Sequence, residues 1–283
     1  MANVLPALRV LENNLPTTHP GSAFAAGHVL APRDAEGDAD PELSALYAPL
    51  TGGDSVLQGG DSALGSGSAL PDVRANFITT LDGSVIGADG KSGSINGPAD
   101  LRVFQLLRAQ SDAVFVGAGT ARTEGYQDTD IPAGLEDLRA DGNPKMVTVT
   151  RSGDLAPEFL DTAPLIITAN GHPAAQKLRG TVPPENLLVF GTDAVDFPAA
   201  LRELRARGYE NVLCEGGPHL MGALISHGLV SELCLSFSPM IVGGSGYRFM
   251  VGQLSKTTAQ LQVLLSAADG YLMSRWTLRS ARD

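Results

Sequence analysis

From residue 73 onward, apolar positions recur with either the period of a strand or the period of a helix. Runs rich in Val, Ile, Leu and Thr predict strands, and apolar residues that return every three or four positions predict helices. Within 73–90 we predict a strand, a turn at Asp82-Gly83 and a second short strand. The other predicted strands lie within 112–117, 145–155, 163–171, 186–191, 212–215, 231–244 and 270–280. The predicted helices lie within 97–110, 118–125, 198–208 and 218–230.

The helix within 97–110 has a clear start. Gly97 and Pro98 precede it, and proline is tolerated at the first helical position because its missing N–H would have no partner there. Leu101, Phe104 and Leu107 recur at helical spacing on one face. We therefore expect this face to pack against the sheet.

The order of the elements predicts the fold class. Strands that alternate with helices indicate an α/β fold with a largely parallel central sheet. The strands after residue 231 have no helix between them, so we expect an antiparallel addition at the C-terminal end. No internal repeat is present.

Residues 1–70 have a different texture. They contain two basic residues against eight acidic ones, which is −6 of the net charge of −11. Six glycines between Gly52 and Gly67 predict a loop or linker, and a short apolar patch at 43–50 has helical spacing. Leu5, Leu8, Val10 and Leu11 would allow this region to dock over an apolar groove. We treat 1–70 as an acidic extension and 71–283 as the main domain.

Charge and composition narrow the possible partners. An acidic protein repels the phosphate backbone, so we expect no nucleic-acid partner, and an anionic substrate would need a local basic patch. No apolar run reaches the roughly 18 residues of a membrane span, and no signal peptide is apparent, which predicts a cytoplasmic protein. Cys214 and Cys234 lie in apolar runs and show no metal-ligand spacing, so we expect core cysteines and no metal site.

Two strand–turn–helix units carry glycine turns. The first contains Gly117 and Gly119 before Thr120, and the second contains Gly216 and Gly217. Glycine lets a phosphate approach the backbone closely, and the amides at a helix N-terminus favour an anion. Two such turns in one sheet suit a dinucleotide, although either one alone is also typical of an ordinary βα turn.

Several polar side chains are candidates for the site. Glu215 ends a buried strand, where it would accept hydrogen bonds from a substrate, cap a helix or pair with an arginine. Asp82 either acts in the site or forms the Asp-Gly turn. Arg102 and Arg108 either hold a phosphate or lie on a solvated helix face, and Ser92 and Ser94 either bind a phosphate or are loop residues.

The segments "NFITTLDGSVIG", "LRVFQLLRAQSDAVFVGAGTAR" and "VLCEGGPHLMGALISHGLVSELCLSFSPMIVGG" resemble the reductase domain of riboflavin-biosynthesis proteins over about residues 70–280. The resemblance implies a dihydrofolate-reductase-like three-layer sandwich and a homodimer to which the C-terminal strands contribute. It also implies that NADPH donates a hydride to C1′ of 5-amino-6-(5-phosphoribosylamino)uracil, which gives the ribitylamino product.

The resemblance also assigns site residues by position. Ser92, Arg108 and Glu215 fall at substrate contacts, and Asp82 and Glu215 are the candidate catalytic residues. The positions implied for NADPH are Thr79, Ser94, Gly117, Gly119, Thr120, Glu124, Ser152, Gly216, Gly217, Pro218, His219 and Leu220. Arg122 and Arg151 are candidates for the ribose phosphate of the coenzyme.

The chain departs from the family pattern in two places, and this keeps alternatives open. The zinc deaminase domain of bifunctional members is missing, and "TARTEGYQ" replaces the usual T-x-x-x-D-[ND]-P, with Glu124 at the aspartate position. One alternative is the reduction of dihydrofolate or another pteridine or pyrimidine on the same fold. The other is a non-catalytic nucleotide-binding protein whose N-terminal segment covers the cofactor cleft.

Overall fold

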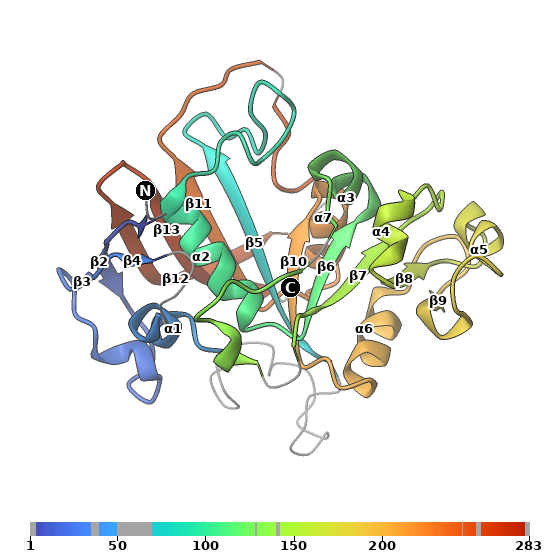
Figure 1. Ribbon diagram of the computed structural model, residues 1–283, viewed down its shortest axis with the longest axis horizontal. Coiled ribbons are helices and arrows are strands. Elements are labelled where there is room, and N and C mark those ends of the chain that lie inside the picture. The colour runs from blue at the N-terminus through green and yellow to red at the C-terminus, as the bar shows by residue number, and fades with distance from the viewer. Residues whose placement is uncertain are drawn as a thin grey trace.

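The computed structural model describes residues 4–34, 40–49, 70–127, 129–139, 142–244, 246–252 and 256–280. Its main feature is an eleven-stranded sheet with the order β3-β2-β12-β13-β11-β5-β10-β6-β7-β8-β9 (Figure 1). Seven neighbouring strands are parallel: β5 (Asp72–Thr80), β6 (Ala113–Gly117), β7 (Lys145–Val149), β8 (Leu165–Thr168), β9 (Leu187–Val189), β10 (Asn211–Gly216) and β11 (Glu232–Ser238).

The remaining strands of this sheet run antiparallel at one side. They are β13 (Leu272–Ser280), β12 (Thr257–Ala267), β2 (Leu8–Asn13) and β3 (Val29–Leu30), and a separate pair is formed by β1 (Val4–Leu5) and β4 (Arg33–Asp34). The predicted class, a largely parallel sheet with antiparallel C-terminal strands, is therefore confirmed.

Helices lie on both faces of the sheet (Figure 1). The α-helices are α1 (Pro41–Tyr47), α2 (Pro98–Ala109), α3 (Ala118–Glu124), α4 (Pro157–Asp161), α5 (Pro173–Lys177), α6 (Phe197–Ala206) and α7 (Pro218–Ser226). Short 3-10 helices occupy Pro20–Ala23, Glu136–Leu138 and Pro184–Asn186.

Two buried clusters define the layers. Leu106 of α2 packs in one cluster with Leu213 of β10. Leu204 of α6 and Met221 of α7 pack in the other with Val212 of β10. Successive residues of a strand point to opposite faces, so Val212 and Leu213 mark the two sides of the sheet. The face toward α2, which we call the α2 face, also carries the functional site.

Helix α2 begins and ends as its sequence predicts, but its buried stripe is shifted. Gly97 is the extended N-cap residue and Pro98 opens the helix. The most buried apolar residues are Ala99, Val103, Leu106 and Leu107, whereas Leu101 and Phe104 are only half-buried. The shift turns Phe104 away from the centre of the core and toward the cavity described below.

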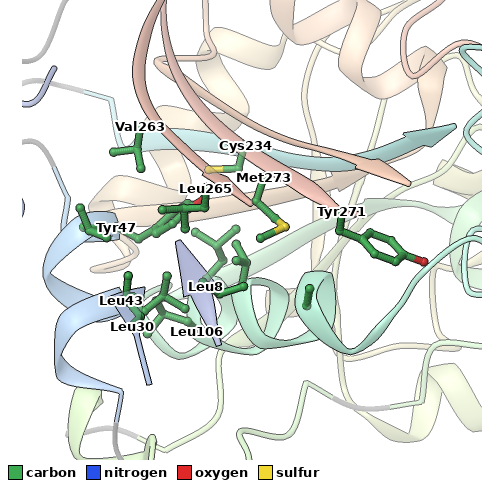
Figure 2. Close-up of a cluster of buried hydrophobic side chains, with 14 of the residues drawn as sticks. Leu8, Leu30, Leu43, Tyr47, Leu106, Cys234, Val263, Leu265, Tyr271 and Met273 are labelled. Atoms are coloured by element: carbon green, nitrogen blue, oxygen red, sulfur yellow. The ribbon is translucent and has the colours of Figure 1, made fainter. Parts of the chain in front are cut away.

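The N-terminal segment, by which we mean residues 4–34 and 40–49, packs against the sheet and α2. Strand β2 extends the sheet by pairing with β12, and Leu8 of β2 is fully buried (Figure 2). Leu43 and Tyr47 of α1 join the same cluster as Leu106 and Met273. The described residues of this segment thus dock against the main domain as expected, although Leu11 is 40% exposed. The glycine-rich linker predicted within 51–70 lies almost wholly outside the described residues, and the division at residue 70 stays a prediction.

A buried ion pair fixes this segment to α2. Arg102 donates from Nε and Nη2 to the two carboxylate oxygens of Asp40 at 2.6 and 3.0 Å, and from Nη1 to the carbonyl of Pro6 at 2.7 Å. Both side chains are almost completely buried. Both interpretations of Arg102 from the sequence, a phosphate contact and a solvated helix face, were wrong, because its side chain is buried and paired with Asp40.

The Asp40–Arg102 pair gives the first test of this packing. Asp40→Ala leaves a buried guanidinium without its carboxylate and also removes the side-chain cap of α1 at Leu43 N, so we expect the free energy of unfolding to fall by about 3 kcal/mol. Chemical denaturation measures it. Glu42→Ala, which removes a half-exposed pair with His28, should cost less than about 1 kcal/mol. An equal loss in both variants would contradict the structural role of the pair.

Two further differences from the sequence-based prediction concern strands. The second short strand expected after Asp82-Gly83 is not formed, and residues 81–97 are a loop. Strand β12 was not predicted, although Leu261, Val263 and Leu265 alternate along it. Among the described residues no helix is long and apolar enough to cross a bilayer, and no group of acidic, His and Cys side chains is arranged to hold a metal ion.

Candidate active site

A cavity of about 430 Å³ opens on the α2 face of the sheet. It lies beside the end of β10 and the start of α3, where open α/β sheets bind ligands. Strand β5, the loop that follows β5, helix α2 and the two glycine turns all contribute to its wall. The lining residues that carry the argument are Asn76, Asp100, Phe104, Arg108, Thr120, Glu124, Tyr126, Glu215, Gly217 and Pro218, together with Ser92.

Glu215 is at the centre of a buried polar cluster in this wall. Arg108 donates from Nε and Nη2 to its two oxygens, each at 2.8 Å, and the Tyr126 hydroxyl donates to Oε2 at 2.6 Å. The Glu215 side chain is 2% exposed and that of Arg108 13%. The guanidinium also lies over the ring of Phe104, 4.4 Å from its centroid. Of the interpretations given from the sequence, pairing with an arginine is what the structure shows, and the pair faces the cavity.

The charges in this cluster support one another. Burial alone would lower the pKa of Arg108, but the Glu215 carboxylate holds it above its usual value. Burial and the charge of Glu215 raise the pKa of Tyr126 well above its usual value. The cluster therefore keeps a charged guanidinium and a protonated hydroxyl in the wall of the cavity at neutral pH.

The strand pattern explains why Glu215 points to this site. Leu213 packs on the α2 face, and Glu215 follows it by two residues, so both side chains point the same way. Cys214 between them is buried in the cluster on the opposite face. A carboxylate at the end of this strand thus meets Arg108 near the end of α2.

The two predicted glycine turns lie side by side, because β6 and β10 are neighbours. A Cβ atom on Gly217 would lie 2.4 Å from Thr120 Oγ1, and one on Gly117 would lie 3.5 Å from Gly217 N. Gly216 has a φ of +94°, which favours glycine. The two turns consequently form one backbone surface next to Glu215.

The turn before α7 also presents hydrogen-bond donors. Gly217 is the N-cap residue without a side-chain cap, and Pro218 opens the helix. The first-turn amides of His219 and Leu220 have no acceptor inside the helix, and no partner for them is found among the described residues. Leu220 itself is buried and His219 is exposed, so these residues offer their backbone rather than their side chains.

Ser92 and Glu124 are joined at the cavity entrance. The Glu124 carboxylate accepts a hydrogen bond from Ser92 N at 2.8 Å, which ties the loop after β5 to the end of α3. Ser94 is exposed and donates to Asp89 at 2.6 Å, and it does not line the cavity. Of the two serines, only Ser92 is brought to the site.

Other predicted site residues lie away from the cavity. The Asp82 carboxylate accepts from the Thr80 hydroxyl at 2.5 Å and from Gly243 N at 2.7 Å, and these bonds lower its pKa. It is exposed and ties two loops together, so the structure gives it the turn role and we no longer include it in the active site. Thr79 is buried and donates to the Ser84 carbonyl.

The remaining candidates lie in the loop after β7 or, like Arg122 of α3, against it. Ser152 is exposed and accepts from Asp154 N at 3.2 Å, and Arg151 is exposed as well. Arg122 donates to the Asp154 carbonyl at 2.6 Å. These side chains lie outside the cavity, and any coenzyme contact they make would be with the part of the coenzyme that extends beyond it.

Three of the polar lining residues named above were not recognised as site residues from the sequence. Tyr126 lies in the "TEGYQ" stretch that departs from the family pattern, so that departure was itself a signal. Asp100 falls three residues before Val103 and seven before Leu107, which places an acid on the buried stripe of α2. Asn76 lies in the middle of β5 and offers no comparable signal.

The fold and the cavity define an α/β protein whose candidate ligand site lies beside two neighbouring glycine turns. The chain belongs to the family of the RibD C-terminal domain, whose sequence model matches residues 71–272. The resemblance to the reductase domain of riboflavin-biosynthesis proteins is thereby confirmed. The N-terminal segment lies outside the matched residues.

Individual relatives agree with this placement. The chain is 32% identical over 184 residues to the 2,5-diamino-6-ribosylamino-4(3H)-pyrimidinone 5′-phosphate reductase of Methanothermobacter thermautotrophicus, covering 64% of this chain and 83% of that protein. It is 28% identical over 177 residues to the riboflavin biosynthesis protein RibD of Mycobacterium tuberculosis, covering 62% and 44%. A pyrimidine reductase-like protein from Corynebacterium diphtheriae superposes with a TM-score of 0.65 at 26% identity, over 75% of this chain and 93% of that one.

Proposed function

We propose that this protein is an NADPH-dependent reductase that converts the ribosylamino group of a pyrimidine 5′-phosphate into a ribitylamino group. The observation that carries the proposal is that one cavity is lined both by the glycine turns, through Thr120, Gly217 and Pro218, and by the Arg108–Glu215 pair. A coenzyme and a polar substrate would thus meet in the same space.

The chemistry requires little from the protein beyond alignment. The ribosylamine opens to an imine at C1′, which accepts a hydride at carbon and a proton at nitrogen. NADPH, when bound, supplies the hydride. The chain holds the imine carbon near the nicotinamide position and excludes water, and these contributions account for much of the rate in such reactions.

The two glycine turns fit a bound dinucleotide. The free amides of His219 and Leu220 and the dipole of α7 favour a phosphate, and the bare backbone at Gly119 leaves space for close approach, because a Cβ atom there would meet nothing within 4 Å. Thr120 and Glu124 flank the same surface. Arg122, Arg151 and Ser152 stay candidates for the ribose-phosphate end of the coenzyme.

Gly119→Ala tests the coenzyme site without disturbing the fold. The added methyl group meets no protein atom, so the melting temperature should stay within about 2 °C, while NADPH affinity should fall at least about tenfold because the phosphates lose their close approach. Titration of NADPH followed by fluorescence measures this. Ala206→Ser, which adds one atom at an exposed position of α6 away from the cavity, should keep the affinity within about twofold. Equal affinities in the two variants would count against the glycine-turn site.

The proposed reaction leaves open which pyrimidine ring the substrate carries. The expected ring is the uracil, whereas the Methanothermobacter relative is named for a 2,5-diaminopyrimidinone. Turnover of either compound with oxidation of NADPH would support the proposal. Dihydrofolate, assayed beside them, tests the pteridine alternative.

The remaining alternative and the oligomeric state concern other parts of the chain. A non-catalytic protein with its cleft covered by the N-terminal segment is not favoured, since none of the described residues of that segment lines the cavity.

The homodimer stays a prediction. Along Val263–Ala267 the edge of β12 already pairs with β2, so the C-terminal strands would have to reach a partner by other surfaces.

A further inference from the structure

Helix α2 has two opposite sides with different neighbours. Phe104 and Arg108, which lie four residues apart, line the cavity. Arg102, Leu106 and Gln110 follow one another at the same spacing, each two residues away from one of the cavity residues. Two residues correspond to about 200° of rotation around an α-helix, so the two sets lie on nearly opposite sides of α2. We call the side with Arg102, Leu106 and Gln110 the back of α2.

The N-terminal segment holds the back of α2 at two places. In the first half of the helix, Arg102 donates to both carboxylate oxygens of Asp40 and to the carbonyl of Pro6. At the C-cap, Gln110 donates from Nε2 to the Ser44 carbonyl of α1 at 3.0 Å. The two ties are about 12 Å apart along the helix axis, so they fix the stretch of α2 that faces the cavity on its other side.

Helix α1 is itself fixed to the sheet. Tyr47 of α1 packs in the same buried cluster as Leu106 at the back of α2 (Figure 2). Arg74 of β5 donates from Nη1 to the Tyr47 carbonyl at 2.9 Å and to Gln110 Oε1 at 3.3 Å, and from Nε to Glu232 of β11 at 3.0 Å. The C-terminal end of α2 is therefore connected to strand β5, which forms another part of the cavity wall.

The cavity side of α2 has fewer means of holding the helix in place. The residues before α2, 81–97, form a loop, and Phe104 and Arg108 border space that a ligand would fill. Packed neighbours fix the position of an element, and a cavity removes such neighbours on one side. The position of Arg108 opposite Glu215 therefore depends on the contacts at the back of α2.

We propose that the N-terminal segment aligns the active site from behind, with Asp40 and Gln110 as positioning residues that hold α2 so that Arg108 meets Glu215 and the substrate. The inference rests on the proposed function. The segment lies outside residues 71–272, which the family model matches, and none of its described residues lines the cavity. Its effect on the site therefore passes through α2. The glycine turns precede α3 and α7, so coenzyme binding should depend on the segment much less.

The kinetic test uses Gln110→Met in the full-length protein, with Gln105→Met as its matched control. Gln110→Met keeps the length of the side chain and removes its hydrogen bonds to α1 and β5. We expect kcat/KM for the pyrimidine substrate to fall at least about tenfold, since a misplacement of about 1 Å can cost about 100-fold, while the dissociation constant for NADPH changes by less than about twofold. Gln105 lies on the same helix, does not line the cavity, and its buried Oε1 has no hydrogen-bond partner among the described residues. Gln105→Met should change kcat/KM by less than about twofold.

A second readout needs no turnover. The Nε–H of Arg108 donates to Glu215, and its exchange with solvent, followed by 15N NMR, reports how firmly the two side chains are held together. We expect exchange to be at least about tenfold faster in Asp40→Ala and in Gln110→Met, because each loosens α2 locally. The rate in Gln105→Met should equal that of wild type. All variants are compared at a temperature at which circular dichroism shows them to be folded.

The outcomes separate this inference from the proposed function. An unchanged exchange rate of the Arg108 Nε–H in both Asp40→Ala and Gln110→Met would overturn the inference, whatever the kinetics show. So would an equal loss of kcat/KM in Leu204→Ala, which lowers stability through a cavity in the cluster on the opposite face of the sheet, because the effect would then follow stability alone. If the wild type reduces neither pyrimidine, the proposed function fails, and the exchange rates still decide whether the segment positions Arg108.

Discussion

Replacing Glu215 by glutamine should lower kcat/KM for the pyrimidine substrate by about 100-fold, while the dissociation constant for NADPH changes by less than about threefold. The glutamine keeps the shape of the side chain but leaves the buried guanidinium of Arg108 without its ion pair, and removal of one partner of such a pair costs several kcal/mol. Because we propose that Arg108 faces the substrate, most of this cost should appear in substrate binding and alignment. Steady-state kinetics and NADPH titration measure the two quantities separately.

Two variants make this prediction specific. Tyr126→Phe removes one hydrogen bond to Glu215 and leaves the ion pair intact, so its kcat/KM should fall by only about tenfold. Gly217→Val places atoms against Thr120, where even a Cβ lies at 2.4 Å, and should weaken NADPH binding itself. If Glu215→Gln and Gly217→Val weakened NADPH binding equally, the division between a substrate side and a coenzyme side would be wrong.

Removal of Glu232 should have the largest effect on stability, a loss of about 4 kcal/mol in the free energy of unfolding for Glu232→Ala. Its carboxylate accepts from Arg74 Nε at 3.0 Å and from Arg275 Nε and Nη2, each at 2.9 Å. The Arg275 side chain is fully buried, so the variant leaves two guanidinium groups in the interior without a counter-charge. Glu203→Ala, which breaks a more exposed pair with Arg207, should cost less than about 0.5 kcal/mol.

The same cluster joins the N-terminal segment to the sheet. Arg275 donates to the carbonyls of Leu46 and Ala48, and Arg74 donates to the carbonyl of Tyr47, so both cations cap the C-terminal end of α1. Burial would raise the pKa of Glu232, but the two guanidinium groups lower it below its usual value. Its stabilising effect is present above the unfolded-state pKa near 4.5 and is lost as pH falls through the lower folded-state value. The difference between wild type and Glu232→Ala should accordingly shrink in acid and stay constant near neutrality.

The sequence carries the order of the elements but not the contacts between distant ones. Periodicity identified α2 and β10 separately, and Arg108 and Glu215 were each recognised as candidates, yet their pairing depends on how α2 packs on the sheet. Asp82 shows the opposite case, since the Asp-Gly turn expected from the sequence is formed and its carboxylate accepts from the Thr80 hydroxyl two residues away. Local patterns are reliable for such turns because the partners are only a few residues away.

Two omissions had signals that were present in the sequence. Apolar residues alternate with polar ones along strand β12, at Leu261, Val263 and Leu265, and a similar alternation occurs in its partner β2 near the other end of the chain. No local sequence pattern indicates that two strands so far apart in the chain form a pair. Asp100 occupies a position on the buried stripe of α2, where a polar residue conflicts with the surrounding pattern. Such conflicts between local pattern and fold are where functional residues are expected.

The most direct test of the central claim follows the hydride itself. The protein is incubated with NADPH deuterated at the reactive C4 position and with the 2,5-diamino-6-ribosylaminopyrimidinone 5′-phosphate, and the product is examined by mass spectrometry and NMR. The account predicts a ribitylamino product that carries deuterium at C1′, formed with stoichiometric oxidation of NADPH. An unlabelled product, or bound NADPH with no conversion of either pyrimidine substrate, would contradict it.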